Sequence, residues 1–301
     1  KLLNLEEIIH RRLINQEEAV KAVAESLREY RSGLSREKGP IAAFLFVGPT
    51  GVGKTELAKT LAEVQFGSEE AMVRLDMSEY QEVQSIHRLI GAPDGETGGA
   101  LTDAVREKPY CLVLLDEFEK AHPDIWNLFL QVFDDGRLTD NLGRVVDFEN
   151  TIIIVTSNAH SDVIHQSLSR GESVASIAEY LKKILVDVFK PELLNRFSDI
   201  IVFRDLNPNE LGAIVELQLK ELAKLLEEKQ NVVLVYTPQV TELIVKLGYD
   251  PAFGARPIGR TIRDKIREPL SEKIISGEIH RGSTVKVDVV GEEIVISSTG
   301  Q

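Results

Sequence analysis

The sequence is poor in the features that mark secreted and membrane-bound proteins. It contains a single cysteine, Cys111, so no internal disulfide can form, and a reducing, cytoplasmic location is expected. It has no apolar run near the roughly 18 residues that a membrane-spanning helix needs, and no secretory signal pattern. The six histidines show no metal-ligand spacing. We therefore expect neither a membrane partner nor a metal centre built on histidine.

Basic residues are outnumbered too, with 35 Lys and Arg against 48 Asp and Glu and a net charge of −13. This balance argues against nucleic acid as a partner through a basic face, although a local basic channel is compatible with it. No Ser/His/Asp or Cys/His grouping suggests a protease. The 301 residues are 43% hydrophobic, enough for one large domain or two ordinary ones. Because the first residue is Lys1, the sequence is interpreted as a fragment or a processed chain.

A strand, a glycine-rich turn and a helix are expected in succession between residues 41 and 63. The continuous apolar run 41–47 predicts a buried parallel strand, and residues 56–63 have helical spacing without a breaker. Between them, Gly48-Pro-Thr-Gly-Val-Gly-Lys-Thr55 has the P-loop spacing. A plain glycine turn is the alternative interpretation, but the strand and helix on either side favour a phosphate-binding loop.

The residue types of this loop suit nucleotide binding. Gly51 and Gly53 allow successive backbone N–H groups to turn toward phosphate oxygens, and the helix N-terminus adds partial positive charge. Lys54 can reach the β- and γ-phosphates, and the Thr55 hydroxyl can ligate Mg²⁺. ATP and Mg²⁺ are therefore the expected cofactors. The predicted nucleotide contacts in the loop are Thr50, Gly51, Val52, Gly53, Lys54 and Thr55.

Two acidic residues end another apolar strand, within residues 111–117. Asp116, at the carboxyl end of the strand, would hold Mg²⁺ through water, and Glu117 would orient or deprotonate the attacking water. Adjacent carboxylates are costly unless a cation or specific hydrogen bonds compensate for their repulsion. A solvated Asp-Glu pair is the common alternative at an isolated strand end. Together with the P-loop, the pattern favours an ATPase site.

Three more short strands complete a predicted five-stranded parallel sheet of the α/β class. Residues 151–155 form one of them, and the others lie at 72–75 and 200–203. Asn158 follows the first of these strands. Its side chain can hold the attacking water or the γ-phosphate, whereas a simple turn-forming asparagine is the alternative.

A second, smaller unit is predicted beyond Arg204, where asparagine and proline residues interrupt the pattern. A long amphipathic helix over 208–229 and an alternating hairpin about Gly291 indicate a mainly helical domain with a short β-sheet. We therefore expect a large P-loop domain at 1–204 and a small C-terminal domain at 205–301.

Several motifs in fixed order give the chain a close resemblance to a known family. They lie at Gly48–Lys59, Asp76–Tyr80, Leu114–Asp124, Asp134–Asp140, Pro191–Phe197 and Gly254–Pro257. With them the sequence resembles the second ATPase module of the Clp-type AAA+ chaperones, and among these the bacterial disaggregases. The resemblance implies AAA+ large and small domains. It also implies a homo-hexameric ring or spiral that pulls unfolded or aggregated polypeptide through its pore.

The resemblance assigns roles to residues at matching positions. Leu13 and Ile14 take the place of the segment that packs on adenine, so both would be exposed until the base covers them. Ile214 is a further nucleotide-binding residue by the same match.

Catalytic roles follow from the resemblance as well. Asn158 matches sensor 1. Arg196 matches the arginine finger, which a subunit donates in trans to the γ-phosphate of its neighbour. Arg256 matches sensor 2, which ties the small domain to the nucleotide in cis. Without the match, a surface salt bridge would be the ordinary interpretation of either arginine.

The chain departs from the family pattern in one loop. The family follows Leu-Ile-Gly-Ala-Pro with an aromatic residue flanked by glycines, whereas Leu89–Gly99 is several residues shorter and has no aromatic residue. Two explanations stay open: the loop truly differs, so that the ring threads polypeptide poorly or has another task, or residues of a longer loop are missing from the sequence. The apolar-Gly-apolar loop of members that dock on a peptidase is not found between Ala159 and Lys190, so no peptidase partner is expected.

Two functions from different classes compete. The first is an ATP-hydrolysing protein remodeller, and the second is a nucleotide-dependent oligomerisation module that does not thread polypeptide. The residues between Gly91 and Gly99 discriminate between them, because a grip on polypeptide needs a bulky apolar side chain. A small-molecule kinase is a third hypothesis, and Glu117, Asn158 and the second domain argue against it.

Overall fold

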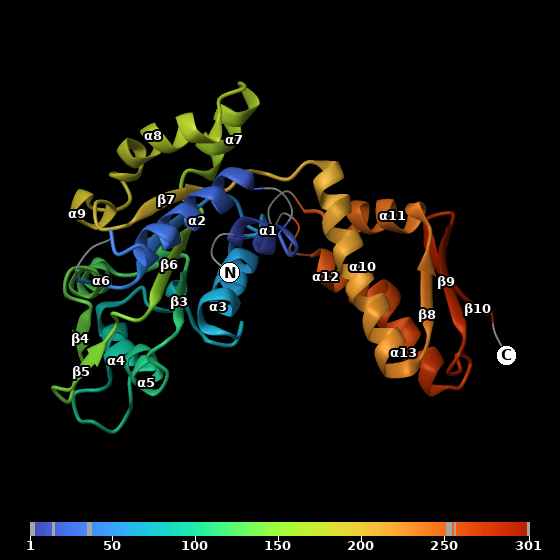
Figure 1. Cartoon of the computed structure of the whole chain (residues 1–301), viewed down its shortest axis with the longest axis horizontal. Coiled ribbons are helices and arrows are strands. Elements are labelled where there is room, and N and C mark those ends of the chain that lie inside the picture. The colour runs from blue at the N-terminus through green and yellow to red at the C-terminus, as the bar shows by residue number, and fades with distance from the viewer. Residues whose placement is uncertain (1–3, 14–15, 35–37, 251–254, 256, 300–301) are drawn as a thin grey trace. The chain divides into compact units, whose positions relative to one another are not determined.

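The computed structural model describes residues 4–13, 16–34, 38–250, 255 and 257–299. Two predicted site residues, Ile14 and Arg256, lie outside these ranges. The chain divides into two compact units (Figure 1). The large unit comprises Lys1–Pro49 and Gly53–Arg204, and the small unit comprises Thr50–Val52 and Asp205–Gln301.

A five-stranded sheet forms the centre of the large unit, in the order β2-β3-β6-β1-β7, and all its pairings are parallel. The predicted α/β fold class is therefore confirmed. The strands are β1 (Ala42–Val47), β2 (Met72–Asp76), β3 (Leu112–Asp116), β6 (Ile152–Ser157) and β7 (Asp199–Val202). Every residue of β1 and β6 is buried, which explains why β1 and residues 152–155 of β6 are continuous apolar runs rather than alternating ones.

Helices flank this sheet, with α2 and α8 against β7, α3 against β3 and α5 against β2. The helices of the large unit are α1 (Leu5–His10), α2 (Glu17–Arg31), α3 (Lys54–Phe66), α4 (Ile86–Ile90), α5 (Ala100–Glu107), α6 (Pro123–Asp135), α7 (Ser161–Ser169), α8 (Val174–Leu185) and α9 (Pro191–Leu194). The core between helices and sheet includes the aromatic group Phe118, Trp126 and Phe189. The Trp126 indole N–H donates to the Phe118 carbonyl at 2.9 Å, so the buried N–H group has a hydrogen-bond partner.

One element of the large unit differs from expectation. The segment after α6, for which the sequence analysis predicts no strand, forms a two-stranded antiparallel hairpin, β4 (Arg137–Thr139) and β5 (Val145–Asp147). Only the central side chain of each strand is buried, Leu138 in β4 and Val146 in β5. Three residues are too few for alternation to be recognised as a strand pattern.

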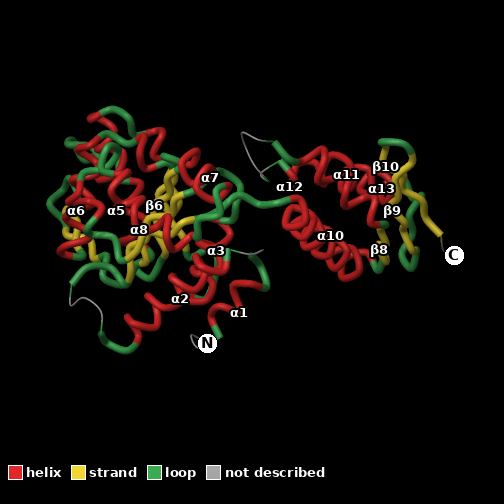
Figure 2. The backbone as a smooth tube through the Cα atoms, turned by 90° about the horizontal axis from the view of Figure 1, so that it is seen from above, coloured by secondary structure: helices red, strands yellow, loops and turns green. Residues whose placement is uncertain are grey.

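The small unit is mainly helical with a three-stranded sheet, as predicted. Its elements are α10 (Pro208–Gln230), β8 (Val233–Tyr236), α11 (Pro238–Gly248), α12 (Ile258–Ile262), a π-helical turn (Arg263–Arg267), α13 (Glu268–Ile275), β9 (Thr284–Val290) and β10 (Glu293–Thr299). The sheet order is β10-β9-β8, and Figure 2 shows the three strands together with the helices on one side of them. Helix α10 begins with a capping box between Asn207 and Glu210, which explains its sharp start.

Within the described residues, the structure contains no helix that combines the length and the apolar character needed to cross a membrane.

Candidate active site

The parallel register brings three strand ends together at one edge of the large unit's sheet. Phe46 of β1 is paired with Thr156 of β6, and Leu115 of β3 is paired with Val155 of β6. The glycine loop after β1 and the acidic pair at the end of β3 therefore lie on either side of the end of β6. This edge, outside the carboxyl ends of parallel strands, is where open α/β sheets bind their ligands.

The glycine loop has the backbone that its sequence predicts. Gly48, Gly51 and Gly53 have φ values of 147°, 78° and 111°, a region that side-chain-bearing residues rarely adopt. Helix α3 begins at Lys54, directly after the loop. The Lys54 ammonium lies back over the loop and donates to the Gly48 carbonyl oxygen at 2.8 Å. A helix N-terminus, backbone N–H groups and a lysine thus converge at one place, as an anion requires.

Both outer glycines of the loop are also in close contact with their surroundings. A Cβ atom on Gly48 would come within 2.5 Å of the Phe203 carbonyl oxygen, just beyond β7. A Cβ atom on Gly53 would collide with Leu13 Cδ1. Leu13 is therefore buried against the loop, at 4% exposure, and the expectation that it is exposed was wrong. Its apolar side chain packs on a glycine that has no side chain of its own.

A hydrogen-bonded group holds the acidic pair at the end of β3. The Thr156 hydroxyl donates to Asp116 Oδ1 and accepts from the Glu117 N–H, each at 3.2 Å. Arg74 Nε of β2 donates to Asp116 Oδ2 at 2.7 Å. The Asp116 side chain is 19% exposed, so its carboxylate stays open to solvent on one side. These hydrogen bonds and the positive charge of Arg74 thus compensate for the adjacent negative charges of Asp116 and Glu117.

Sequence reasoning missed Thr156 and Arg74. Both residues reach Asp116 from a strand next to β3. In the β2–β3 ladder, Arg74 is paired with Leu114, two residues before Asp116, which is itself paired with Asp76. The polar end of the run 152–157 was a signal for Thr156, but only the strand order shows that it lies beside Asp116.

Glu117 has an unusual backbone, with φ 56° and ψ 49° in the left-handed region. A residue with a side chain there costs on the order of 1 kcal/mol or more. The conformation turns the chain sharply at the end of β3, and the Glu117 carboxylate lies 3.2 Å from the Lys120 ammonium. Such strain at a strand end is typical of residues with a functional role.

The remaining predicted residues lie in different places. Asn158 is exposed in the turn after β6, at the same sheet edge as Asp116. Arg196 follows α9 and forms an ion pair with Asp134 at the end of α6. Both figures place α6 away from α3 within the large unit. Ile214 is half-buried on α10 and packs against the core of the small unit.

Comparison with known proteins agrees with this arrangement. Residues 39–200 match the family described as "AAA domain (Cdc48 subfamily)", and residues 206–287 match "C-terminal, D2-small domain, of ClpB protein". The chain belongs to the AAA domain family. Apart from residues 50–52, the first match lies within the large unit, and the second match lies within the small unit.

Relatives with both regions are named "Chaperone protein ClpB". The chain is 50% identical to the one from Meiothermus ruber over 95% of this chain and 34% of the relative. It is 51% identical to the one from Aquifex aeolicus over 98% of this chain and 30% of the relative, and 51% identical to the one from Agrobacterium fabrum over 95% and 33%. The chain thus spans about a third of the length of these relatives.

The loop in which the AAA domain departs from its expected pattern is compact. The Ala92 N–H donates to the Thr97 carbonyl at 2.9 Å, and the Gly95 N–H donates to the Ala92 carbonyl at 3.0 Å. The carboxylates of Asp94 and Glu96 lie in its exposed part. The loop therefore presents acidic groups rather than an aromatic side chain.

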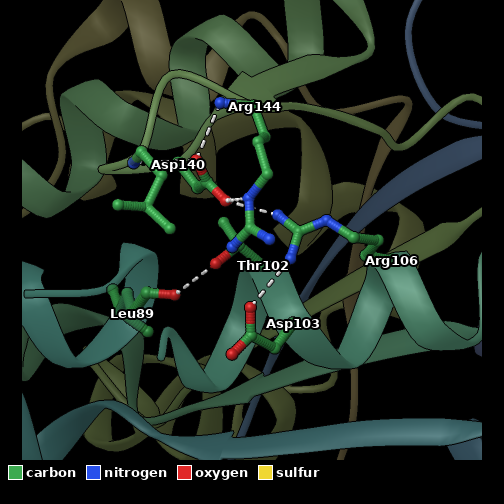
Figure 3. Close-up of polar contacts among 7 residues, drawn as sticks. Leu89, Thr102, Asp103, Arg106, Asp140 and Arg144 are labelled. Carbon is green, nitrogen blue, oxygen red and sulfur yellow. Dashed lines mark hydrogen bonds and ion pairs between the residues drawn. The ribbon is translucent and has the colours of Figure 1, made fainter. Parts of the chain in front are cut away.

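A buried carboxylate fixes the hairpin that packs beside this loop (Figure 3). Asp140, at the turn of β4–β5, accepts from Arg106 of α5 and from Arg144 Nε at 2.8 Å. It also accepts the backbone N–H groups of Leu142 and Arg144, at 3.0 and 2.8 Å. Burial alone would raise the pKa of Asp140, but these N–H groups and the Arg144 guanidinium hold the pKa below its usual value. Asp140 thus ties the hairpin to α5.

Replacing Asp140 with asparagine should lower the melting temperature at pH 7 by several degrees, because Arg106 and Arg144 lose their shared anion. Since the pKa of Asp140 is lower in the folded chain than the ordinary 3.8, its stabilisation is present above pH 3.8 and is lost as the pH falls through the folded value. The gap in melting temperature between wild type and D140N should therefore close in acid. Calorimetry from pH 7 to 3 checks this, and a gap that persists unchanged would contradict it.

Proposed function

We propose that the chain is the ATP-binding and ATP-hydrolysing module of a ring-forming protein remodeller. The observation that carries the proposal is the group at the sheet edge: Asp116 and Glu117 are joined through Thr156, beside a glycine loop that leads into Lys54. A carboxylate pair next to a phosphate-binding loop is the arrangement that phosphoryl transfer to water needs.

The residues present fit ATP and Mg²⁺. Backbone N–H groups of Gly51 and Gly53 and the Lys54 ammonium provide the positive environment for the phosphates, and Thr50 and Val52 complete the loop. The Thr55 hydroxyl and the partly exposed Asp116 carboxylate offer the hard oxygen donors that Mg²⁺ prefers, Asp116 through water. When bound, the cation neutralises charge that develops on the phosphate oxygens.

Glu117 is proposed to orient the attacking water and accept its proton. The left-handed backbone projects this residue from the strand end, and the Glu117 N–H is held by Thr156. Asn158, two residues beyond Thr156, is proposed to position the same water or the γ-phosphate. Catalysis of this kind relies on positioning and fixed charge rather than covalent chemistry.

Arg196 is proposed to act on the nucleotide of a neighbouring subunit. Within its own chain it pairs with Asp134, at the end of α6. An arginine supplied in trans makes hydrolysis depend on assembly, which we propose to be a homo-hexameric ring or spiral. The nucleotide-binding roles of Leu13, Ile14, Ile214 and Arg256 stay predictions.

Unfolded or aggregated polypeptide is the proposed substrate, and the cytoplasm the proposed location. The name of the relatives, Chaperone protein ClpB, favours remodelling over an oligomerisation module that does not thread polypeptide. The absence of a peptidase partner stays a prediction.

Phosphate release from MgATP tests the proposal. Wild-type chain should hydrolyse MgATP, and Lys54→Ala should lose nucleotide binding and hydrolysis together, since Lys54 is the loop's point charge. Lys59→Ala, on the same helix, is the matched control and should keep both. Equal hydrolysis by wild type and K54A would show that the activity belongs to another protein in the preparation.

A further inference from the structure

One buried polar side chain has no part in the proposed chemistry. Gln16, the residue before α2, is 1% exposed and has φ 62° and ψ 38° in the left-handed region. Burying a polar amide is unfavourable unless it is hydrogen-bonded, and the left-handed backbone costs on the order of 1 kcal/mol for a residue with a side chain. Two unfavourable features at one residue require strong compensating contacts.

Those contacts are made with the last residue of the large unit. The Gln16 side-chain Nε2 donates to the Arg204 carbonyl at 2.9 Å, and its Oε1 accepts from the Arg204 N–H at 3.0 Å. The amide therefore pairs with both backbone groups of one residue, as a neighbouring strand would. The contact joins residues 188 positions apart in the chain.

Arg204 lies next to the glycine loop. The preceding Phe203 N–H donates to the carbonyl of Val47, the last residue of β1, at 2.8 Å. The Phe203 carbonyl lies against Gly48 so closely that no Cβ atom fits between them. The backbone segment that Gln16 holds thus packs directly against Gly48, the first glycine of the loop.

The chain just before Gln16 meets the loop at its other end. Leu13 packs against Gly53, the glycine that precedes α3. Arg12 is tied to α3 and the turn after it, with Nη1 at 2.6 Å from Glu63 and Nη2 at 2.7 Å from Glu69. Arg12 and Gln16 therefore anchor the chain on either side of Leu13, the residue that packs on the loop.

We propose that Gln16 is a positioning residue for the nucleotide: its amide fixes the Phe203–Arg204 backbone against Gly48 while Leu13 lies against Gly53. The inference rests on the proposed nucleotide function. Gln16 acts through these neighbours and does not touch the phosphates. Loss of its hydrogen bonds should therefore weaken binding of the nucleotide equally in the ground state and in the transition state. Uniform weakening of this kind raises KM and leaves kcat nearly unchanged.

Two variants separate the side chain from the backbone. Gln16→Glu has the same shape, but a carboxylate cannot donate to the Arg204 carbonyl. Gln16→Gly removes the amide and accepts the left-handed backbone without strain, which protects the fold. Asn231→Gly is the matched control, since Asn231 also has a positive φ, at 52°, but lies at the end of α10 in the small unit.

Titration with a fluorescent ATP analogue and steady-state hydrolysis give the first readout. Q16G should bind the analogue about tenfold more weakly, as expected for two lost hydrogen bonds, and Q16E, which loses one of them, should be weakened less. In both variants KM for MgATP should rise and kcat should stay within about twofold of wild type. N231G should match wild type. Wild-type affinity in Q16G would overturn the proposal.

Hydrogen exchange gives a readout that does not depend on activity. The Arg204 N–H, which donates to Gln16 Oε1, should exchange faster in Q16G, whereas Q16E keeps an acceptor for it and the β1–β6 ladder stays protected in both variants. Unchanged exchange at Arg204 in Q16G would refute the proposal even if binding were weakened. If wild type binds the analogue without hydrolysing it, the proposed function fails while the positioning role is still measured by binding and exchange.

Discussion

Replacing Glu117 with glutamine should leave ATP binding intact and lower the turnover number by about 10²-fold or more. Glutamine keeps the size of the side chain and cannot accept a proton from water. The Asp116 carboxylate, with its contacts to Thr156 and Arg74, is unaffected by the change. Binding and hydrolysis should therefore separate cleanly in this variant.

Filter binding of radiolabelled ATP, together with phosphate release, measures both properties of E117Q. Glu107→Gln is a suitable control, because Glu107 is an exposed glutamate at the end of α5 in the same unit. It should behave as wild type. Turnover by E117Q at the wild-type rate would refute the assignment of Glu117 as the base.

The second large effect concerns Arg196. Arg196→Ala should lower hydrolysis by about 10³-fold while ATP binding in the same subunit is retained. The physical reason is that Arg196, which pairs with Asp134 in its own chain, is proposed to stabilise the γ-phosphate of a neighbouring subunit. In the proposed assembly, the Arg196 guanidinium of one subunit lies at the γ-phosphate bound by its neighbour.

The control for R196A is Arg170→Ala, since Arg170 is an exposed arginine of the same unit at the end of α7. R170A should keep both binding and hydrolysis. Loss of ATP binding in R196A would contradict a role in trans, because it would place the guanidinium in its own nucleotide site.

Much of the fold could be predicted from sequence because its signals are local. The strands β1, β3 and β6 begin with continuous apolar runs of at least four residues, and the glycine loop combines three residues that need unusual φ values with a lysine at the helix start. These features require no knowledge of distant contacts. The hairpin β4–β5 was missed because each of its strands has a single buried residue.

The supporting residues could not be predicted in the same way. The strand order brings Thr156 and Arg74 to Asp116, and Gln16 bonds to Arg204, which is 188 positions away in the sequence. A local pattern in Leu13–Gln16 gives no sign of that partner. The expectation that Leu13 is exposed failed for the same reason, since the residue that covers it, Gly53, is distant in sequence.

The most direct test of the account is to mix E117Q and R196A, two variants that should each be nearly inactive. An R196A subunit keeps Glu117, and a neighbouring E117Q subunit keeps Arg196. If the site is completed in trans, the mixture should hydrolyse ATP, at about a quarter of the wild-type rate for random pairing of equal amounts. A mixture no more active than the separate variants, under conditions where wild type is active and assembled, would contradict the account.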